Sequence, residues 1–93
     1  MHLTEAQFDI LRAWAQHTAQ VKEAYLFGSY VKGAALAGSD VDIAIRASVI
    51  DWTFRTAKWE EHLTKAIGIK VNIRTLELPN VRRSCDQYGV PLK

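Results

Sequence analysis

Hydrophobic residues recur at helical spacing in the first segment of the chain. In residues 4–18 they form one broad face: Phe8, Ile10, Leu11, Trp14 and Ala15. Thr4 and Gln7 have the spacing of a capping box, with Leu3 and Phe8 at the flanking staple positions. The pattern predicts a helix that begins after Thr4.

A second helical pattern covers the middle of the chain. Ser48 or Asp51 can cap this helix, which continues to about Ala66, and Gly68 occupies the position at which many helices end. Its apolar face consists of Trp52, Trp59, Leu63 and Ala66. We expect the tryptophans, Trp14 included, to pack in the core; a hydrophobic partner surface is the alternative.

Three other segments have the composition or the alternation of β-strands. Val21–Phe27 is rich in β-branched and aromatic residues and ends at Gly28. Residues 41–45 are apolar except for Asp42, and residues 69–78 begin with alternating apolar and polar positions and stop at Pro79. Residues 30–36 are compatible with a short helix, and residues 80–93 predict a short helix followed by a tail at 89–91.

This order of elements predicts an α+β fold with a small mixed sheet of about three strands and helices packed on it. Only about a dozen residues separate the first two strands, which is too few for a parallel crossover, so these strands should be antiparallel. The second and third strands are joined by a full helix and can be parallel. We expect one domain over residues 1–93.

Composition narrows the class of protein. The chain has 93 residues, 48% hydrophobic and 24% charged, which is ordinary for a globular domain, and its net charge of +2 argues against direct nucleic-acid binding. The single cysteine, Cys85, excludes an internal disulfide and fits a cytoplasmic protein. The sequence contains no membrane-spanning or signal-peptide pattern. Because so small a core is marginal, a partner or a homo-oligomer can complete it.

Candidate chemistry is concentrated between residues 28 and 42. Gly28 and Ser29 follow a predicted strand and begin a predicted helix, where backbone N–H groups and a hydroxyl can hold a phosphate. Asp40 and Asp42 lie two apart at the start of a strand, so their carboxylates share one face. Mg²⁺ favours one or two protein carboxylates together with substrate phosphates. Each feature alone is common in structural roles, and their combination is far more specific.

The spacing Gly-Ser, ten residues, Asp-x-Asp resembles the signature of the polymerase-β-like nucleotidyltransferases, and most closely their minimal (MNT) branch. The matching positions are Gly28, Ser29, Gly33, Ser39, Asp40, Val41 and Asp42. The similarity extends over nearly the whole chain, because the helix and strand at 52–73 and the ending at 89–92 also look like those of the family. The resemblance implies the nucleotidyltransferase fold.

The resemblance also implies a reaction and a partner. Family members bind a nucleoside triphosphate, here most plausibly ATP, with one or two Mg²⁺ ions, and transfer the nucleoside monophosphate to a hydroxyl. Gly28, Ser29 and Ser39 would bind the nucleotide, and Asp40 and Asp42 would ligate the metal. Minimal members are often antitoxins of small helical HEPN proteins, and some adenylylate a tyrosine of that partner.

The chain departs from the family at the third carboxylate of the catalytic set, where Asn72 stands. Asn72 keeps one acceptor oxygen but loses the charge and the basicity. Glu77 cannot replace it, because it lies five residues further on, on the other face of an extended strand and about 17 Å away. Glu60 and Glu61 are expected to be solvated.

These observations leave three hypotheses. The chain is an active nucleotidyltransferase, a catalytically disabled antitoxin that binds its HEPN-type partner, or a subunit of a larger nucleotidyltransferase assembly. Two weaker candidates have structural alternatives: Lys32 can assist with phosphate or lie in solvent, and Arg82–Arg83 can contact a phosphate, an acidic partner or only water.

Overall fold

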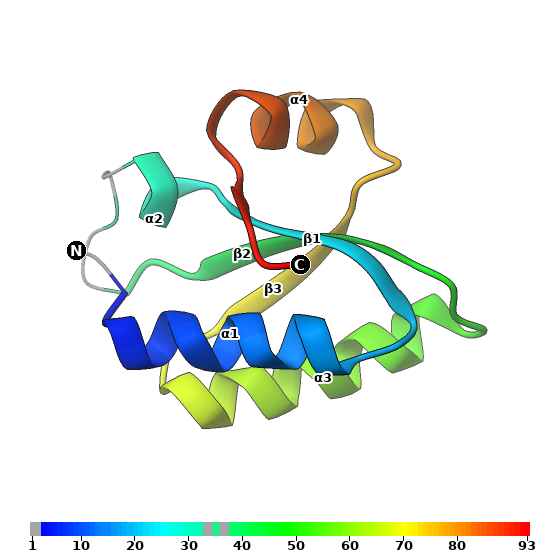
Figure 1. Ribbon diagram of the computed structural model, residues 1–93, viewed down its shortest axis with the longest axis horizontal. Helices are drawn as coiled ribbons and strands as arrows, with labels where there is room; N and C mark the ends of the chain where they lie inside the picture. Colours follow the sequence, from blue (N-terminus) through cyan, green and yellow to red (C-terminus); the bar gives the residue numbers. More distant parts are fainter. Residues whose placement is uncertain (1–2, 33–34, 36–37) are drawn as a thin grey trace.

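The computed structural model describes residues 3–32, 35 and 38–93, so the predicted motif residue Gly33 and the side chain of Lys32 lie outside the description. The described residues form α1 (Glu5–His17), β1 (Val21–Phe27), α2 (Ser29–Lys32), β2 (Val41–Ala47), α3 (Trp52–Ile67), β3 (Val71–Thr75), α4 (Pro79–Tyr88) and β4 (Val90–Pro91). The strands make one mixed sheet in the order β3-β2-β1-β4 (Figure 1).

The strand directions are those predicted from the sequence. β1 pairs antiparallel with β2, and β2 pairs parallel with β3. The predicted tail at 89–91 is wrong, because Val90–Pro91 is a fourth strand that pairs antiparallel with β1. Two residues are too few for a recognisable pattern; this strand is held by long-range contacts, including a 2.8 Å hydrogen bond from the Leu92 N–H to the Ala24 carbonyl.

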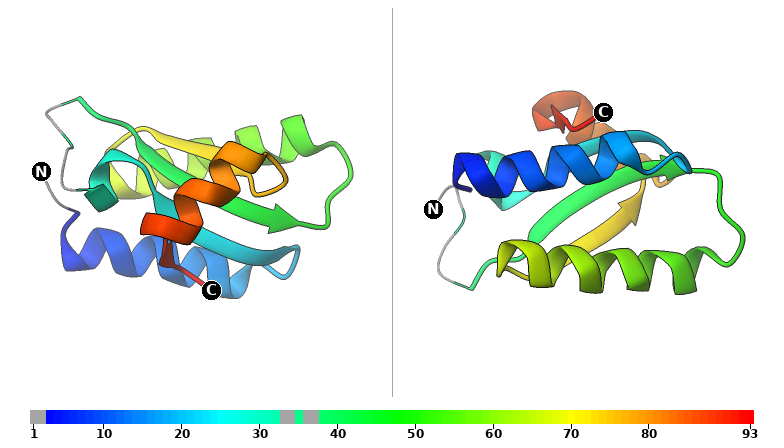
Figure 2. Two further views of the ribbon diagram at one scale, coloured as in Figure 1. Left: turned by 90° about the horizontal axis from the view of Figure 1, so that it is seen from above. Right: turned by 60° about the horizontal axis from the view of Figure 1, so that its bottom comes forward.

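The helices cover both faces of the sheet. α1 and α3 lie against one face, and α4 lies on the other (Figures 1 and 2). The main core fills the space on the α1–α3 side, with Leu11, Ile43, Ile45 and Leu63 fully buried. A smaller cluster lies under α4, where Val81 and Cys85 contact Ala44 and Leu76. None of the helices in the described part of the chain is long and apolar enough to cross a membrane.

α1 begins and packs as the sequence indicates. Thr4 and Gln7 form the predicted capping box. The Gln7 side chain also donates to the Ile67 carbonyl at 2.9 Å, which joins the start of α1 to the end of α3. Trp14 and Trp59 meet edge-to-face with ring centroids 5.6 Å apart, so the core interpretation of these tryptophans is confirmed. Ile10, expected on the apolar face, is instead exposed.

α3 differs from expectation at both ends. Asp51 is its N-cap residue but has a left-handed backbone (φ +56°), and its side chain makes no capping hydrogen bond. At the other end Ala66 is exposed and Ile67 is buried. Gly68 ends the helix as predicted, at φ +76°, with its N–H donating to the Thr64 carbonyl.

The outer edge of β3 is covered by side chains of α3. Thr64 Oγ1 accepts from the Val71 N–H at 3.0 Å, and Glu60 Oε2 accepts from the Ile73 N–H at 2.7 Å. The expectation that Glu60 is a solvated charge is therefore wrong. Glu61 is exposed and pairs with Lys65, as expected for a surface residue.

Candidate functional site

The sheet topology brings the candidate residues to one end of the sheet. Because β1 and β2 are antiparallel, the end of β1, with Gly28 and Ser29, lies beside the start of β2, with Asp40 and Asp42. Because β2 and β3 are parallel, Asn72 also lies there, directly opposite Asp42 in register. α2 begins at the same end (Figure 1). Segments far apart in sequence thus meet in one site.

Asn72 links the two aspartates. Its side-chain amide donates to Asp40 Oδ2 at 2.9 Å, and it also hydrogen-bonds the Asp42 carboxylate. An amide N–H can do this without the repulsion that a third carboxylate would bring. The Asn72 side chain therefore holds both carboxylates in place in the absence of any cation.

The Asp42 carboxyl group has a perturbed pKa. Partial burial raises this pKa above its ordinary value, and the negative charge of Asp40 acts in the same direction. The hydrogen bond from Asn72 and the positive charge of Arg74 oppose the rise. Asp42 is a partly desolvated carboxylate beside a second carboxylate. A bound cation would stabilise the ionised form of both.

Gly28 gives the backbone a close approach to Asp42. Its φ is +84°, a conformation that residues with a side chain rarely adopt. A Cβ atom built on Gly28 would lie 2.6 Å from Asp42 Oδ2, closer than any real contact. Glycine is therefore required here for two separate reasons.

Ser29 and Ser39 flank this site on the two segments that enter it. Ser29 is the first residue of α2, and Ser39 precedes Asp40; both are half-buried. The Tyr30 hydroxyl donates to the Ser39 carbonyl at 3.3 Å. A hollow of about 330 Å³ adjoins Asp40, lined by Tyr30, Gly38, Ser39, Asp40, Gly68, Ile69 and Lys70.

The donor set fits a metal ion that keeps other ligands. Within the described residues no group of three or more His, Cys, Asp or Glu side chains could hold an ion by itself. Asp40 and Asp42 offer two carboxylates, whereas Asn72 directs its amide N–H at Asp40. Because Mg²⁺ binds through one or two carboxylates plus substrate phosphates, this pair fits Mg²⁺ that arrives with a nucleotide.

One charged residue near the site was not identified from the sequence as a site residue. Arg74 lies two residues after Asn72, so both side chains are on the same face of β3. It is exposed, and its charge acts on Asp42. The period of two, counted on from Asn72, is the signal that identifies it.

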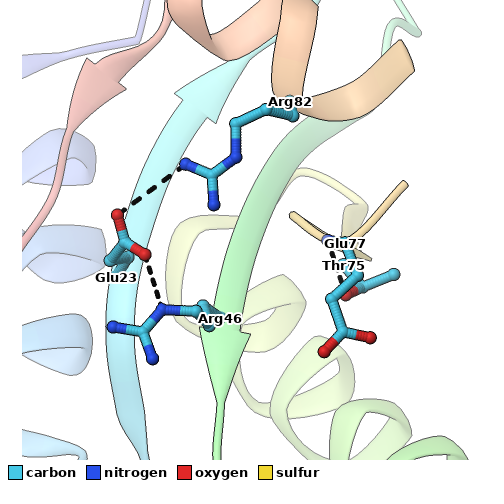
Figure 3. Close-up of polar contacts among 5 residues, drawn as sticks. All are labelled: Glu23, Arg46, Thr75, Glu77 and Arg82. Carbon is cyan, nitrogen blue, oxygen red and sulfur yellow. Dashed lines mark hydrogen bonds and ion pairs between the residues drawn. The ribbon is translucent and has the colours of Figure 1, made fainter. Parts of the chain in front are cut away.

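Other polar contacts lie on the α4 side of the sheet, at the end of β1 and β2 away from Asp42. Glu23 accepts from Arg46 Nε at 2.6 Å and lies 3.8 Å from Arg82, and Figure 3 shows both arginines directed at its carboxylate. Arg82 of the Arg82–Arg83 pair thus faces a carboxylate of its own chain. Glu77 lies in the turn after β3, five residues beyond Asn72, where its backbone N–H donates to Thr75 Oγ1 (Figure 3).

Comparison with known proteins gives both a family and individual relatives. The family model described as "Nucleotidyltransferase domain" matches residues 9–84. The protein adenylyltransferase MntA of Thermococcus cleftensis is 38% identical over 53 residues, which are 57% of this chain. The match spans only about half (54%) of that relative's length.

Solved structures share the fold. A crystal structure of a toxin–antitoxin with AMP-PNP superposes with a TM-score of 0.77 at 22% identity, over 94% of this chain and 72% of that chain. A complex of the tri-AMPylated HEPN toxin of Shewanella oneidensis with its MNT antitoxin gives 0.68 at 20% identity, over 95% and 69%. The mixed α+β fold is therefore that of these proteins.

Proposed function

The chain belongs to the nucleotidyltransferase domain family, and we propose that it transfers AMP from ATP to a hydroxyl group. The observation that carries the proposal is the junction of Gly28 with Asp42: the backbone of the turn from β1 into α2 lies against a half-buried carboxylate. Gly28, Ser29 and Ser39 would bind the triphosphate. Asp40 and Asp42 would hold Mg²⁺, which when bound neutralises charge on the phosphates.

In this reaction the acceptor hydroxyl oxygen forms a bond to the α-phosphorus of ATP. The bond from that phosphorus to the oxygen bridging the β-phosphate breaks, and pyrophosphate leaves. Asn72 cannot accept the hydroxyl proton, because its amide is not basic. With Asp40 and Asp42 engaged by the metal, the proton would pass to water, and we expect slow turnover compared with a site that has a carboxylate at residue 72.

We further propose a HEPN-type partner whose tyrosine is the acceptor. The support is that several solved structures with this fold are toxin–antitoxin complexes, one of them with a tri-AMPylated HEPN toxin. The relative from Thermococcus cleftensis is named an adenylyltransferase. The unpaired Cys85 fits a reducing, cytoplasmic setting for this pair.

Calorimetric titration with ATP and Mg²⁺ tests the site, and labelled AMP transfer to a small helical HEPN protein tests the reaction. We expect saturable, metal-dependent binding that Asp42→Ala abolishes and that Asp9→Ala, an exposed aspartate on α1, leaves unchanged. ATP binding that survives in Asp42→Ala would refute the site.

Asn72 favours one alternative, a catalytically disabled antitoxin that acts by binding alone. In that case the double variant Asp40→Ala/Asp42→Ala still neutralises the partner toxin in cells. Loss of neutralisation by a folded double variant would instead support the transfer reaction.

A further inference from the structure

The charged and polar groups of the site do not match a site built for two cations. Asp40 and Asp42 bring two negative charges, Asn72 brings none, and Arg74 brings one positive charge. Two divalent cations bound close together repel each other, and this site has only two carboxylates to add to the nucleotide phosphates that offset the repulsion. With both carboxylates ionised, the net charge of these four side chains is close to that of a single carboxylate.

Asn72 stands beside Asp40, at the position of the family's third carboxylate. Its amide N–H, a donor, points at Asp40 Oδ2 from 2.9 Å. An amide N–H cannot ligate a cation, and it occupies one of the acceptor sites of Asp40 Oδ2. A carboxylate at residue 72 would face Asp40 across the same short distance and would need a cation between them.

Arg74 lies where its charge can reach a nucleotide bound at the carboxylates. It pairs in register with Ala44, the next position on the same face after the Asp42–Asn72 pair. Its side chain is exposed and makes no hydrogen bond or ion pair with the described residues. Its positive charge nevertheless acts to lower the pKa of Asp42. A guanidinium with free N–H groups binds phosphate oxygens in a bidentate manner.

We propose that this site binds its nucleotide with one divalent cation, on Asp40 and Asp42, and that Arg74 supplies at the phosphates the positive charge that a second cation would bring. The inference rests on the proposed nucleotide binding and specifies how it is achieved. Asn72 is the positioning residue, because it holds Asp40 by a hydrogen bond instead of by a shared ion.

Electron paramagnetic resonance of Mn²⁺ bound with AMP-PNP counts the cations directly. Two ions in such sites lie about 4 Å apart and give a spin-coupled spectrum, whereas one ion gives the spectrum of an isolated Mn²⁺. We expect one isolated Mn²⁺ for each chain with bound nucleotide. A coupled pair would overturn the inference and leave the proposed function standing, whereas no AMP-PNP binding would overturn both.

Asn72→Asp tests the assignment of Asn72. With the third carboxylate restored, the AMP-PNP complex should show the coupled Mn²⁺ pair. An isolated ion in this variant would contradict the role given to Asn72. Because the new carboxylate faces Asp40, folding of the variant is monitored by circular dichroism with and without Mn²⁺, and recovery of the fold only with Mn²⁺ would also support the inference.

Arg74→Ala tests the second half of the proposal and does not involve the metal ligands. We expect AMP-PNP to bind about tenfold more weakly, with partial rescue in Arg74→Lys and a smaller dependence on salt. Arg55→Ala is the matched control, because Arg55 is also exposed but lies on α3, across the sheet from the site. Equal affinities in the two alanine variants would overturn the role of Arg74.

Discussion

Gly28 combines a special backbone conformation with a close approach to a candidate site residue. Its positive φ sets the turn from β1 into α2, and the missing Cβ leaves room for the Asp42 carboxylate. The same φ occurs at Gly38 and Gly68, but a Cβ atom there would meet nothing within 4 Å. Substituting Gly28 and Gly68 therefore separates the cost of backbone strain from the cost of the clash with Asp42.

Gly28→Ala should destabilise the fold more than Gly68→Ala. Each variant forces alanine into a left-handed conformation, which costs about 1–2 kcal/mol. Gly28→Ala adds the clash with Asp42, for which about 1–3 kcal/mol is typical of overpacking. Urea denaturation measures both free energies of unfolding, and equal losses would show that the Asp42 contact is not tight.

Asp42 should make stability depend on pH. Because burial raises its pKa in the folded state, the folded chain holds this proton to higher pH than the unfolded chain does. The stabilisation is present below the unfolded value of 3.8 and is lost as pH rises through the folded pKa. Asp42→Asn should therefore be more stable than the wild type at pH 7, with a difference that shrinks toward pH 3.8.

Urea denaturation of both proteins across that pH range, without divalent cations, measures the difference. Asp86→Asn, at an exposed position on α4, serves as the control and should show no such trend. A difference that grows on acidification would mean that the folded state lowers the pKa of Asp42. Added Mg²⁺ and ATP should stabilise the wild type and Asp86→Asn but not Asp42→Asn.

At the scale of elements, α3 both supports the sheet and protects its edge. Glu60 and Thr64 lie one helical turn apart and accept the outward N–H groups of Ile73 and Val71. An exposed strand edge invites pairing with another chain, and this arrangement prevents it. At the other edge, β4 is two residues long and contains Pro91, which has no N–H to donate.

Glu60→Ala should cost about 1–3 kcal/mol, because the half-buried Ile73 N–H loses its acceptor. Glu61→Ala is the neighbouring control: its pair with Lys65 is exposed, so less than about 0.5 kcal/mol is expected. Chemical denaturation gives both values. Faster hydrogen exchange at the Ile73 amide in Glu60→Ala alone would support the assigned contact, and unchanged exchange would contradict it.

At the scale of the whole molecule, the last residues complete the sheet and the main core. β4 pairs with β1, and Leu92 is 1% exposed within the core on the α1–α3 side. The chain thus passes from α4 on one face of the sheet to the core on the other (Figure 2). This segment joins the two layers that the sheet separates.

Leu92→Ala should therefore destabilise the protein by about 2–5 kcal/mol, as expected for a fully buried leucine. Leu78→Ala is the matched control at a leucine that is 47% exposed, and a change within about 0.5 kcal/mol is expected. Thermal and urea denaturation distinguish the two. A small loss in Leu92→Ala would mean that the C-terminal segment is dispensable for the fold.

Short-range spacing in the sequence determined most elements and the geometry of the motif. Helical periodicity placed α1 and α3, β-branched and apolar composition placed β1 and β2, alternation placed β3, and the connection lengths gave the strand directions. The period of two also put Asp40 and Asp42 on one face. Such features depend on near neighbours in the chain, which is why the sequence alone was sufficient for them.

Only the tertiary structure decided what depends on residues distant in sequence. β4 exists because β1 offers it a partner, Glu60 is an edge acceptor because α3 lies along β3, and Asn72 is a hydrogen-bond donor because β3 places it opposite Asp42. Arg74 shares the face of Asn72, as the period of two indicates, but its place near Asp42 likewise depends on the pairing of β3 with β2. No local pattern encodes these contacts, since each arises only when the sheet brings separate segments together.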